Sequence, residues 1–284
     1  MTHFVDDALA ELRPDVILVY GDLPASEIGA YVSLHRRVPL VHIESGYRSS
    51  DISDPEERTR ILLDHVSRRR ITFSTKMNRN LTNEGIGPDS IAQFGDPSLQ
   101  TLNRRLQGIE SPWELVATGA FGLVTLHHHE NLADGERIRT IIRQIQDLSL
   151  DFPVTFVLYE RTREALLKHG LLKLLLDSSI RVVRTLSYDD YVKVLVNSAF
   201  VVTDSSGLQD ECAFLQKPCI VLRKATPRVE KIGKLLSLVD HSRPNALERA
   251  VRSMIPEGGW RGPDLAYLGK PYDGSFLKLL ASIT

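Results

Sequence analysis

Residues 201–211 read VVTDSSGLQDE, an apolar run followed by a turn of small polar residues and the start of a helix. A short apolar run rich in β-branched residues is typical of a strand that is buried on both faces. Ser205, Ser206 and Gly207 would then place hydroxyl groups and unpaired backbone N–H groups at the positive end of a helix, which suits a phosphate group. A helix that is merely capped by a Ser or Asp side chain is the alternative.

The same alternation of strand and helix extends outward from this stretch in both directions. Strands are expected at 15–20, 39–43, 71–73, 91–94, 122–126, 154–159, 180–183, 200–203 and 219–222. Helices are expected at 27–37, 55–70, 137–148, 164–176, 188–197 and 208–215. Because strands that alternate with helices pair in parallel through right-handed crossovers, the sequence predicts an α/β fold with parallel sheets.

Ligands bind beyond the carboxyl ends of the strands in such sheets, so the residues that follow each apolar run are the informative ones. This rule selects Asp22, Glu44, His127, Tyr159 and 204–207. Asp22 and Glu44, together with Glu56 at the start of a helix, form a candidate carboxylate cluster. Carboxylates that share a cleft raise one another's pKa and can divide acid and base roles. Each of them alone would fit a helix cap or a surface charge.

Two further positions carry candidate chemistry. His127, His128 and His129 follow a buried strand, where an imidazole can exchange protons near neutral pH. Three adjacent histidines point in different directions and do not suit tetrahedral ligation, so no metal site is predicted, and a polar loop without a chemical task is the alternative. Glu211 lies one turn into its helix, where its carboxylate could accept two hydrogen bonds from a ribose diol.

Composition limits the classes of partner. The chain has 284 residues and a formal net charge of -1, which provides no bulk field to attract nucleic acid or an anionic membrane. Its length favours two domains. Cys212 and Cys219 fit buried thiols in a reducing compartment, so a cytoplasmic protein is expected. The first residues lack the pattern of a secretion signal, and no window reaches the roughly 20 apolar residues of a membrane span.

Four segments, read together, resemble successive motifs of the non-hydrolysing UDP-N-acetylglucosamine 2-epimerases. They are PDVILVYGD (14–22), PLVHIESGYRSSDISDPEERTRILLDHVS (39–67), LVTLHHHEN (123–131) and VVTDSSGLQDECAFLQKPCIVLRKATPRVEK (201–231). The family forms are close to PDVVLVHGD, HVEAGLRS with PEExNR, LVTxHRxEN and TDSGGxQEEAxxLGKPxLVxRxxTERPE. Order and spacing agree, and KPYDG (270–274) resembles the family's final NPYGDG. Ser206, Thr59 and Tyr159 depart from this pattern, replacing a Gly, an Asn and a His.

The resemblance implies the GT-B architecture, with two Rossmann-like domains and the active site between them. Residues 1–112 are expected to form the first domain, 113–268 the UDP-binding domain, and 269–284 a segment that packs back on the first domain. Family members open with a further strand and a GTRPE-like loop that carries an Arg and a Lys. The first domain is therefore expected to be incomplete at its N-terminus. A homodimer is expected, or a companion chain that supplies the absent segment.

The implied activity is an isomerase of polysaccharide biosynthesis that interconverts UDP-N-acetylglucosamine and UDP-N-acetylmannosamine. UDP is eliminated, a 2-acetamidoglucal forms, and UDP adds back after a proton returns to C2, without a cofactor. Asp22, Glu44 and Glu56 are the implied acid and base candidates, and His127 lies near the diphosphate. The implied substrate contacts are Arg60, Ser205, Ser206, Gly207, Glu211 and Arg228, of which 205–207 hold the diphosphate and Glu211 the ribose.

Three other functions share parts of this pattern. The first is a non-catalytic UDP-sugar-binding subunit that needs a partner chain. The second is a hydrolysing 2-epimerase that releases N-acetylmannosamine and UDP, although HIESG at 42–46 resembles the non-hydrolysing branch more than the hydrolysing form HIHGGE. The third is a GT-B glycosyltransferase, which would leave the PEE segment at 55–57 unexplained.

Overall fold

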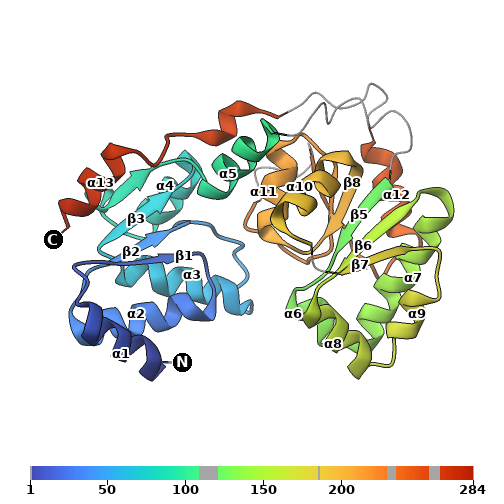
Figure 1. Ribbon diagram of the computed structural model, residues 1–284, viewed down its shortest axis with the longest axis horizontal. Coiled ribbons are helices and arrows are strands. Elements are labelled where there is room, and N and C mark those ends of the chain that lie inside the picture. Colours follow the sequence, from blue (N-terminus) through green and yellow to red (C-terminus); the bar gives the residue numbers. More distant parts are fainter. Residues whose placement is uncertain (1, 109–120, 185, 229–234, 256–262, 284) are drawn as a thin grey trace. The chain divides into compact units, whose positions relative to one another are not determined.

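The computed structural model describes residues 2–108, 121–184, 186–228, 235–255 and 263–283 (Figure 1). Its internal contacts divide the chain into two compact units. Unit 1 consists of Met1–Gln100 and Ala266–Thr284, and unit 2 consists of Thr101–Leu265. The domain boundary expected between residues 112 and 113 lies outside the described residues. The end of the chain belongs to unit 1.

Unit 1 is built on a parallel four-stranded sheet in the order β1–β2–β3–β4. The strands are β1 (Ile17–Tyr20), β2 (Leu40–Ile43), β3 (Arg69–Thr72) and β4 (Ile91–Gln93). The helices are α1 (Thr2–Leu12), α2 (Pro24–Arg36), α3 (Pro55–Val66), α4 (Thr75–Asn83) and α13 (Gly274–Ala281), with a 3-10 turn at Pro88–Ser90. A second 3-10 turn, Leu265–Leu268, begins at the last residue of unit 2. Helix α5 (Pro97–Leu106) contains residues of both units.

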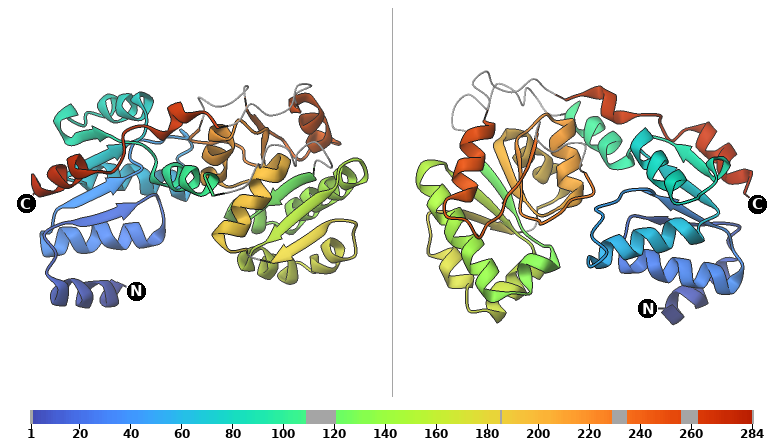
Figure 2. Two further views of the ribbon diagram at one scale, coloured as in Figure 1. Left: turned by 45° about the horizontal axis from the view of Figure 1, so that its top comes forward. Right: turned by 180° about the vertical axis from the view of Figure 1, so that it is seen from behind.

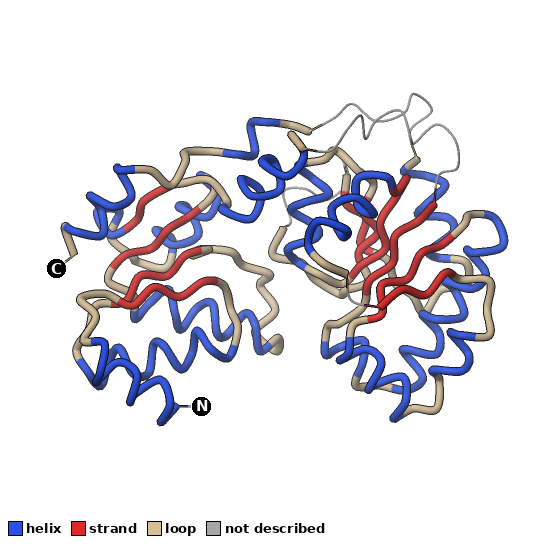
Figure 3. The backbone as a smooth tube through the Cα atoms, in the orientation of Figure 1, coloured by secondary structure: helices blue, strands red, loops and turns tan. Residues whose placement is uncertain are grey.

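Both faces of strand β2 are covered, which fits its apolar run without alternation, whereas the edge strand β1 leaves Leu18 and Tyr20 exposed. Helices α2 and α3 lie on one face and α4 and α13 on the other, as the tube view also shows (Figure 3). Leu40 packs with Leu63 of α3 in the first layer. Val41, the next residue of β2, packs with Phe276 of α13 in the second layer. The C-terminal helix therefore completes the core of unit 1.

Unit 2 is built on a parallel six-stranded sheet in the order β10–β9–β8–β5–β6–β7. The strands are β5 (Phe121–Thr125), β6 (Val154–Leu158), β7 (Arg181–Arg184), β8 (Ser198–Thr203), β9 (Cys219–Val221) and β10 (Leu236–Leu238). The helices are α6 (His129–Leu132), α7 (Gly135–Asp151), α8 (Glu160–Lys168), α9 (Leu172–Leu176), α10 (Tyr188–Asn197), α11 (Ser206–Phe214) and α12 (Ala246–Met254). Helices α10 and α11 cover one face, and α7, α8, α9 and α12 cover the other (Figure 2).

The strand order of unit 2 reverses between its two central strands. From β5 the chain moves outward through β6 to β7, and it then returns to the other side of β5 and continues from β8 through β9 to β10. Strands β5 and β8 are paired along Leu123–Thr125 and Val201–Thr203. In open parallel sheets the crevice beyond such a reversal is the usual place for a ligand. The α/β class with two parallel sheets, predicted from the sequence, is confirmed.

Two predicted helices were wrong in extent. The helix expected at 164–176 is two helices, because Gly170 adopts a left-handed φ of +66° and Leu171 bonds back to the carbonyl of Leu166. The helix expected at 55–70 ends at Val66, and Arg70 lies in β3 as a buried residue whose Nε donates to the carbonyl of Asp64 at 2.6 Å. Among the described residues, none of the helices is both long and apolar enough to cross a bilayer.

Candidate functional site

The ends of β1 and β2 bring Asp22 and Glu44, two of the predicted acidic residues, to one edge of the sheet in unit 1. Tyr20 pairs with Ile43, so the turn at Gly21 and Asp22 lies beside Glu44 at the same edge of the sheet. The backbone N–H of Gly21 donates to the carbonyl of Ile43 at 3.0 Å. A Cβ built on Gly21 would meet Glu44 Oε2 at 3.0 Å. The Glu44 carboxylate therefore lies against the Gly21–Asp22 turn.

Glu44 itself has an unusual backbone conformation. Its φ is +81°, a left-handed value that residues with a Cβ rarely adopt outside strained or functional positions. Its backbone N–H and that of Ser45 both donate to the carbonyl of Ile71, at 3.1 and 3.0 Å. The chain thus turns sharply as it leaves β2, and it is at this turn that Glu44 is placed.

Arg60 of α3 binds carboxylates on two elements. Its Nη1 forms a short ion pair with Asp22, and its Nη2 lies 3.0 Å from Glu57 Oε2. The side chain of Arg60 is 3% exposed and that of Asp22 is 25% exposed. Arg60 therefore joins the buried Glu57 to Asp22, which is the more exposed of the two carboxylates. The side chain that was predicted to contact the substrate thus forms ion pairs within unit 1.

The two glutamates of the PEE segment have different surroundings. Glu56 lies half-buried in the first turn of α3, where its backbone N–H donates to Asp54. Glu57 is buried and accepts hydrogen bonds from the backbone N–H groups of Ser49 and Ser50, at 2.9 and 3.0 Å. Burial alone would raise the pKa of Glu57, but the Ser49 bond and the charge of Arg60 outweigh it and lower that pKa. Sequence reasoning did not select Glu57, because only its burial in the folded protein distinguishes it from Glu56.

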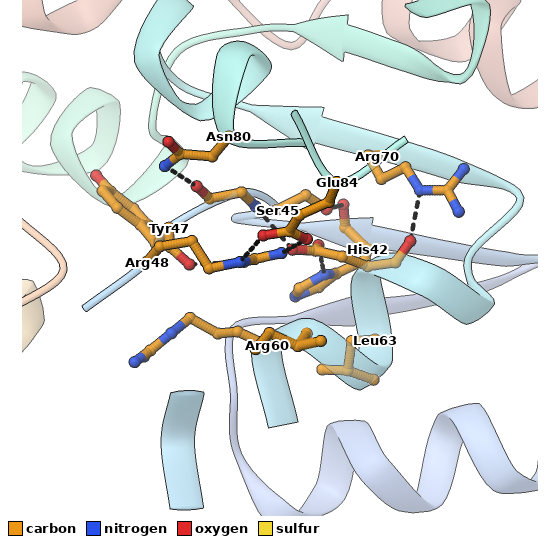
Figure 4. Close-up of polar contacts among 12 residues, drawn as sticks. His42, Ser45, Tyr47, Arg48, Arg60, Leu63, Arg70, Asn80 and Glu84 are labelled. Carbon is orange, nitrogen blue, oxygen red and sulfur yellow. Dashed lines mark hydrogen bonds and ion pairs between the residues drawn. The ribbon is translucent and has the colours of Figure 1, made fainter. Parts of the chain in front are cut away.

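A second polar network lies behind Glu44, on the side of β2 that faces α3 (Figure 4). His42 Nδ1 lies 2.7 Å from Asp64 Oδ1, and neither side chain is exposed. Asp64 Oδ2 also accepts the backbone N–H of Gly46 and lies 2.8 Å from Arg48 Nη1. None of these residues was singled out as functional from the sequence, although His42 and Asp64 belong to the quoted motif.

In unit 2, the carboxylate of Asp204 ties together the loops that follow β5 and β8. It is fully buried and accepts the backbone N–H groups of His127 and His128, at 2.9 and 3.0 Å. It also accepts Nδ2 of Asn131 at 2.9 Å, and the same amide donates to the carbonyl of Leu222 at 2.8 Å. Asp204 and Asn131 thus join the ends of β5, β8 and β9 in one hydrogen-bonded unit at the strand-order reversal.

His127 is a half-buried member of this arrangement. Its side chain is 39% exposed, and Nδ1 lies 3.7 Å from Asp204 Oδ1. Its ring meets that of Tyr159 edge to face, with centroids 6.0 Å apart. The backbone of His127 is held by Asp204 while the imidazole reaches the surface, which leaves it able to contact a ligand of unit 2.

The N-terminus of α11 has the features of an anion site. Ser205 caps the helix by accepting the N–H of Leu208 at 3.3 Å. Arg223 Nη1 donates to Ser206 Oγ at 3.0 Å, so a buried guanidinium adds a full positive charge to the partial charge of the helix end. Gly207 is exposed, and a Cβ built there would meet no atom within 4 Å. Arg223 was missed, although it follows β9 as the strand-end rule requires.

The other two predicted contacts of unit 2 are bound to neighbouring side chains. Glu211 Oε2 accepts the hydroxyl of Tyr191 at 2.5 Å. Arg228 is buried and binds Asp210, with Nε and Nη2 at 2.8 and 2.7 Å from Oδ2. The predicted free cysteines, Cys212 and Cys219, are both buried, the first on α11 and the second on β9.

Comparison with known proteins identifies the family. The family model for UDP-N-acetylglucosamine 2-epimerase matches residues 1–267. This chain belongs to that family. Among curated members, the UDP-N-acetylglucosamine 2-epimerase of Methanocaldococcus jannaschii is 29% identical over 270 residues, which cover 91% of this chain and 74% of the relative. The UDP-2,3-diacetamido-2,3-dideoxy-D-glucuronate 2-epimerase of Pseudomonas aeruginosa is 33% identical over 256 residues, covering 89% and 69%.

The fold agrees with that of the family's solved structures. The Methanocaldococcus jannaschii enzyme, crystallised in complex with UDP-GlcNAc and UDP, aligns with a TM-score of 0.85 at 27% identity. The alignment covers 100% of this chain and 80% of that structure. The chain is therefore a GT-B-like α/β protein of the epimerase family.

Proposed function

We propose that this chain interconverts UDP-N-acetylglucosamine and UDP-N-acetylmannosamine. A base removes the C2 proton, the electrons of the C2–H bond form a C1–C2 double bond, and the C1–O bond breaks so that UDP leaves. The glucal then accepts a proton at C2 on its other face while an oxygen of UDP attacks C1. The product is an isomer of the substrate, so the atoms and electrons balance without an electron acceptor.

The position of Glu44 carries the proposal. Its carboxylate lies against the Gly21–Asp22 turn, so Asp22 and Glu44 lie at the same edge of the sheet. Removal and return of a proton on opposite faces of one carbon require an acid and a base that are distinct groups. Asp22 and Glu44 supply such a pair, and we assign Glu56 to the same group as a third candidate.

Unit 2 supplies the groups that suit a departing diphosphate. The N-terminus of α11, with Ser205 to Gly207, offers N–H groups, and Arg223 adds a charge beside Ser206. Preorganised positive groups stabilise charge that develops on a leaving group. We assign His127 to proton donation at the leaving oxygen and Glu211 to the ribose. We assign Arg60 to the sugar end of the substrate, where its ion pair holds Asp22 in position. We assign Arg228 to the support of α11, through its ion pair with Asp210.

A second substrate has a specific observation in its favour. The relative from Pseudomonas aeruginosa, at 33% identity, is named for UDP-2,3-diacetamido-2,3-dideoxy-D-glucuronate. Epimerisation at C2 of that sugar would use the same elimination and re-addition, with a different group at C3 and a carboxylate at C6. We therefore name it as the alternative substrate of the same site.

Incubation with each UDP-sugar in deuterated water tests the proposal. Nuclear magnetic resonance should show deuterium at C2 and a mixture of the two epimers, for one sugar or for both. The Glu44→Gln variant, which keeps the shape of the side chain, should exchange C2 hydrogen at least about 100-fold more slowly, as expected for loss of a group that transfers the proton.

Other outcomes identify other functions. Release of free N-acetylmannosamine with UDP would replace the proposal with a hydrolysing 2-epimerase. Tight binding of UDP by calorimetry, with no deuterium at C2 of either sugar, would replace it with a binding subunit. Transfer of the sugar to an added acceptor would indicate a glycosyltransferase.

A further inference from the structure

The buried pair of His42 and Asp64 has no task in the reaction proposed above. His42 lies on β2 and Asp64 on α3, and both side chains are fully inaccessible. An ionised carboxylate away from water is costly unless several hydrogen bonds compensate it. His42 Nε2 is also buried and has no hydrogen-bond partner among the described residues. A pair of this kind in the core requires an explanation.

Asp64 contacts the chain on both sides of Glu44. Its Oδ1 binds His42, which is two residues before Glu44, at 2.7 Å. Its Oδ2 accepts the backbone N–H of Gly46, two residues after Glu44, at 3.0 Å. The same oxygen lies 2.8 Å from Arg48 Nη1. One carboxylate therefore spans the segment 42–48 from its beginning to its end.

Arg48 extends this attachment to α4. Its Nε and Nη2 donate to the two oxygens of Glu84 at 2.6 and 2.7 Å, in the bidentate geometry that matches a guanidinium to a carboxylate. Asn80 of α4 donates to the carbonyl of Gly46 at 2.8 Å. The segment is thus held by Asp64 of α3 on one side and by Asn80 and Glu84 on the other, of which Figure 4 labels Asn80 and Glu84.

The backbone of this segment needs such support. Glu44 and Gly46 both have left-handed φ values, +81° and +87°. A Cβ on Gly46 would come within 2.6 Å of the Met77 carbonyl oxygen, so α4 packs directly on the turn. A left-handed residue with a Cβ is strained and persists only where surrounding contacts determine its conformation. Asp64 is the group that supplies contacts to both ends of the turn.

We propose that Asp64 is a positioning residue, whose bonds to His42, Gly46 and Arg48 hold the strained turn that aims the Glu44 carboxylate at C2 of the sugar. The inference rests on the proposed function, in which Glu44 is an acid or base. His42 acts through Asp64, since its Nδ1–H anchors the carboxylate while the ring stays out of contact with substrate. Asp64 contributes no reacting atom.

Asp64→Asn tests the proposal, with Leu63→Ala as the matched control. Leu63 is the preceding residue of α3, is fully buried among Val19, Ala30 and Leu40, and its side chain has no polar contact with the segment. Both variants lose stability, so they are compared at a temperature at which both are folded. Arg48→Lys, which keeps the charge and loses the bidentate geometry, is the milder second variant should Asp64→Asn fail to fold.

Asp64→Asn should lower kcat about 100-fold, the scale expected when a reacting group is displaced by about 1 Å, with KM and the Kd for UDP within about twofold of the wild type. Arg48→Lys should lower kcat about tenfold in the same pattern. Leu63→Ala should leave kcat within about threefold. If Asp64→Asn keeps kcat within threefold, or if Leu63→Ala loses as much, Asp64 is only a stabilising group.

Hydrogen exchange measured on peptides that cover residues 43–48 separates this inference from the proposed function. Asp64→Asn should exchange these amides at least about tenfold faster than the wild type and than Leu63→Ala. If the wild type proves inactive on both sugars but this difference is found, the proposed function fails and the positioning of the turn stands. Unchanged protection in Asp64→Asn would overturn the positioning role whatever the activity.

Discussion

Tyr191 Oη donates a 2.5 Å hydrogen bond to Glu211 Oε2, joining helix α10 to the helix that carries the candidate phosphate site. Burial and the neighbouring Glu211 charge raise the pKa of Tyr191 well above its usual value, so its hydroxyl stays protonated and remains a donor. The orientation of Glu211, which we propose binds the ribose, thus depends on a residue twenty positions earlier in the chain.

Tyr191→Phe should therefore weaken UDP binding. Without the Tyr191 bond, Glu211 should lose its orientation and the hydrogen bond that we propose it makes to the ribose. A hydrogen bond to a charged group contributes about 1.5 to 3 kcal/mol, so we expect the Kd for UDP, measured by calorimetry, to rise at least about tenfold. With 2′,3′-dideoxy-UDP, which has no ribose diol, the wild type and the variant should bind alike. An equal loss with both ligands would contradict a role of Glu211 at the ribose.

Gly21→Ala should disturb Glu44 more than it disturbs the fold. The φ of Gly21 is +65°, at which an Ala costs about 1 to 2 kcal/mol, and the new methyl group would lie 3.0 Å from Glu44 Oε2. Gly170→Ala is the control, since its φ is +66° and its Cβ would meet nothing within 4 Å. Both variants should lose similar stability in urea, but only Gly21→Ala should lose kcat, by about tenfold or more. Equal kcat values would show that Glu44 does not need its place beside Gly21.

Gly207→Ala should separate stability from ligand affinity. A Cβ at Gly207 enters open space at the N-terminus of α11, and Ala in place of Gly at a backbone position that Ala can adopt raises stability by about 0.4 to 1 kcal/mol. The same methyl group would occupy space that a diphosphate needs, so the Kd for UDP should rise at least about tenfold.

Gly122→Ala is the opposite case in the same unit, because its Cβ would collide with the ring of the buried Phe200. It should lower Tm while UDP affinity, measured well below Tm, stays near the wild-type value. If Gly207→Ala binds UDP as tightly as the wild type, the diphosphate does not approach this helix end.

Burial of Lys217 should make the free energy of unfolding depend on pH in the alkaline range. Lys217 is buried, its Nζ donates to the carbonyl of Ser198, and burial lowers its pKa from 10.5 to about 8. Between these values the unfolded chain binds the proton and the folded chain does not, so stability rises with pH. The wild type should gain about 3 kcal/mol relative to Lys217→Met from pH 8 to 10.5, measured by urea unfolding. Parallel pH curves would contradict the lowered pKa.

Glu57 should contribute to stability in the acid range. Its pKa is lowered from 4.5, despite burial, by the Ser49 bond and by Arg60. The folded chain therefore releases this proton more readily than the unfolded chain, and stability is lost as pH falls below about 4.5. The wild type should lose Tm between pH 5 and 3 more steeply than Glu57→Gln. The same acid slope in both proteins would count against this carboxylate.

Local patterns in the sequence predicted much of this protein. Helix α10 was expected at 188–197 and runs from Tyr188 to Asn197, because its apolar period and its Ser187 cap are local signals. The strand-end rule selected Asp22, Glu44 and His127 before any resemblance to a family was considered. It would also have selected Arg223, had residues after β9 been treated like those after the earlier strands.

The sequence by itself determined the α/β class, the family and the positions at the strand ends, because strand and helix periods and ordered motifs are written in consecutive residues. Only the tertiary structure decided which of two adjacent glutamates is buried, how Glu44 turns at +81°, and that Asp64 holds that turn. These properties depend on which strands pair and which helix covers them. The burial of a charge and the bonds that compensate it are set by residues distant in the chain, so they appear only when the layers are assembled.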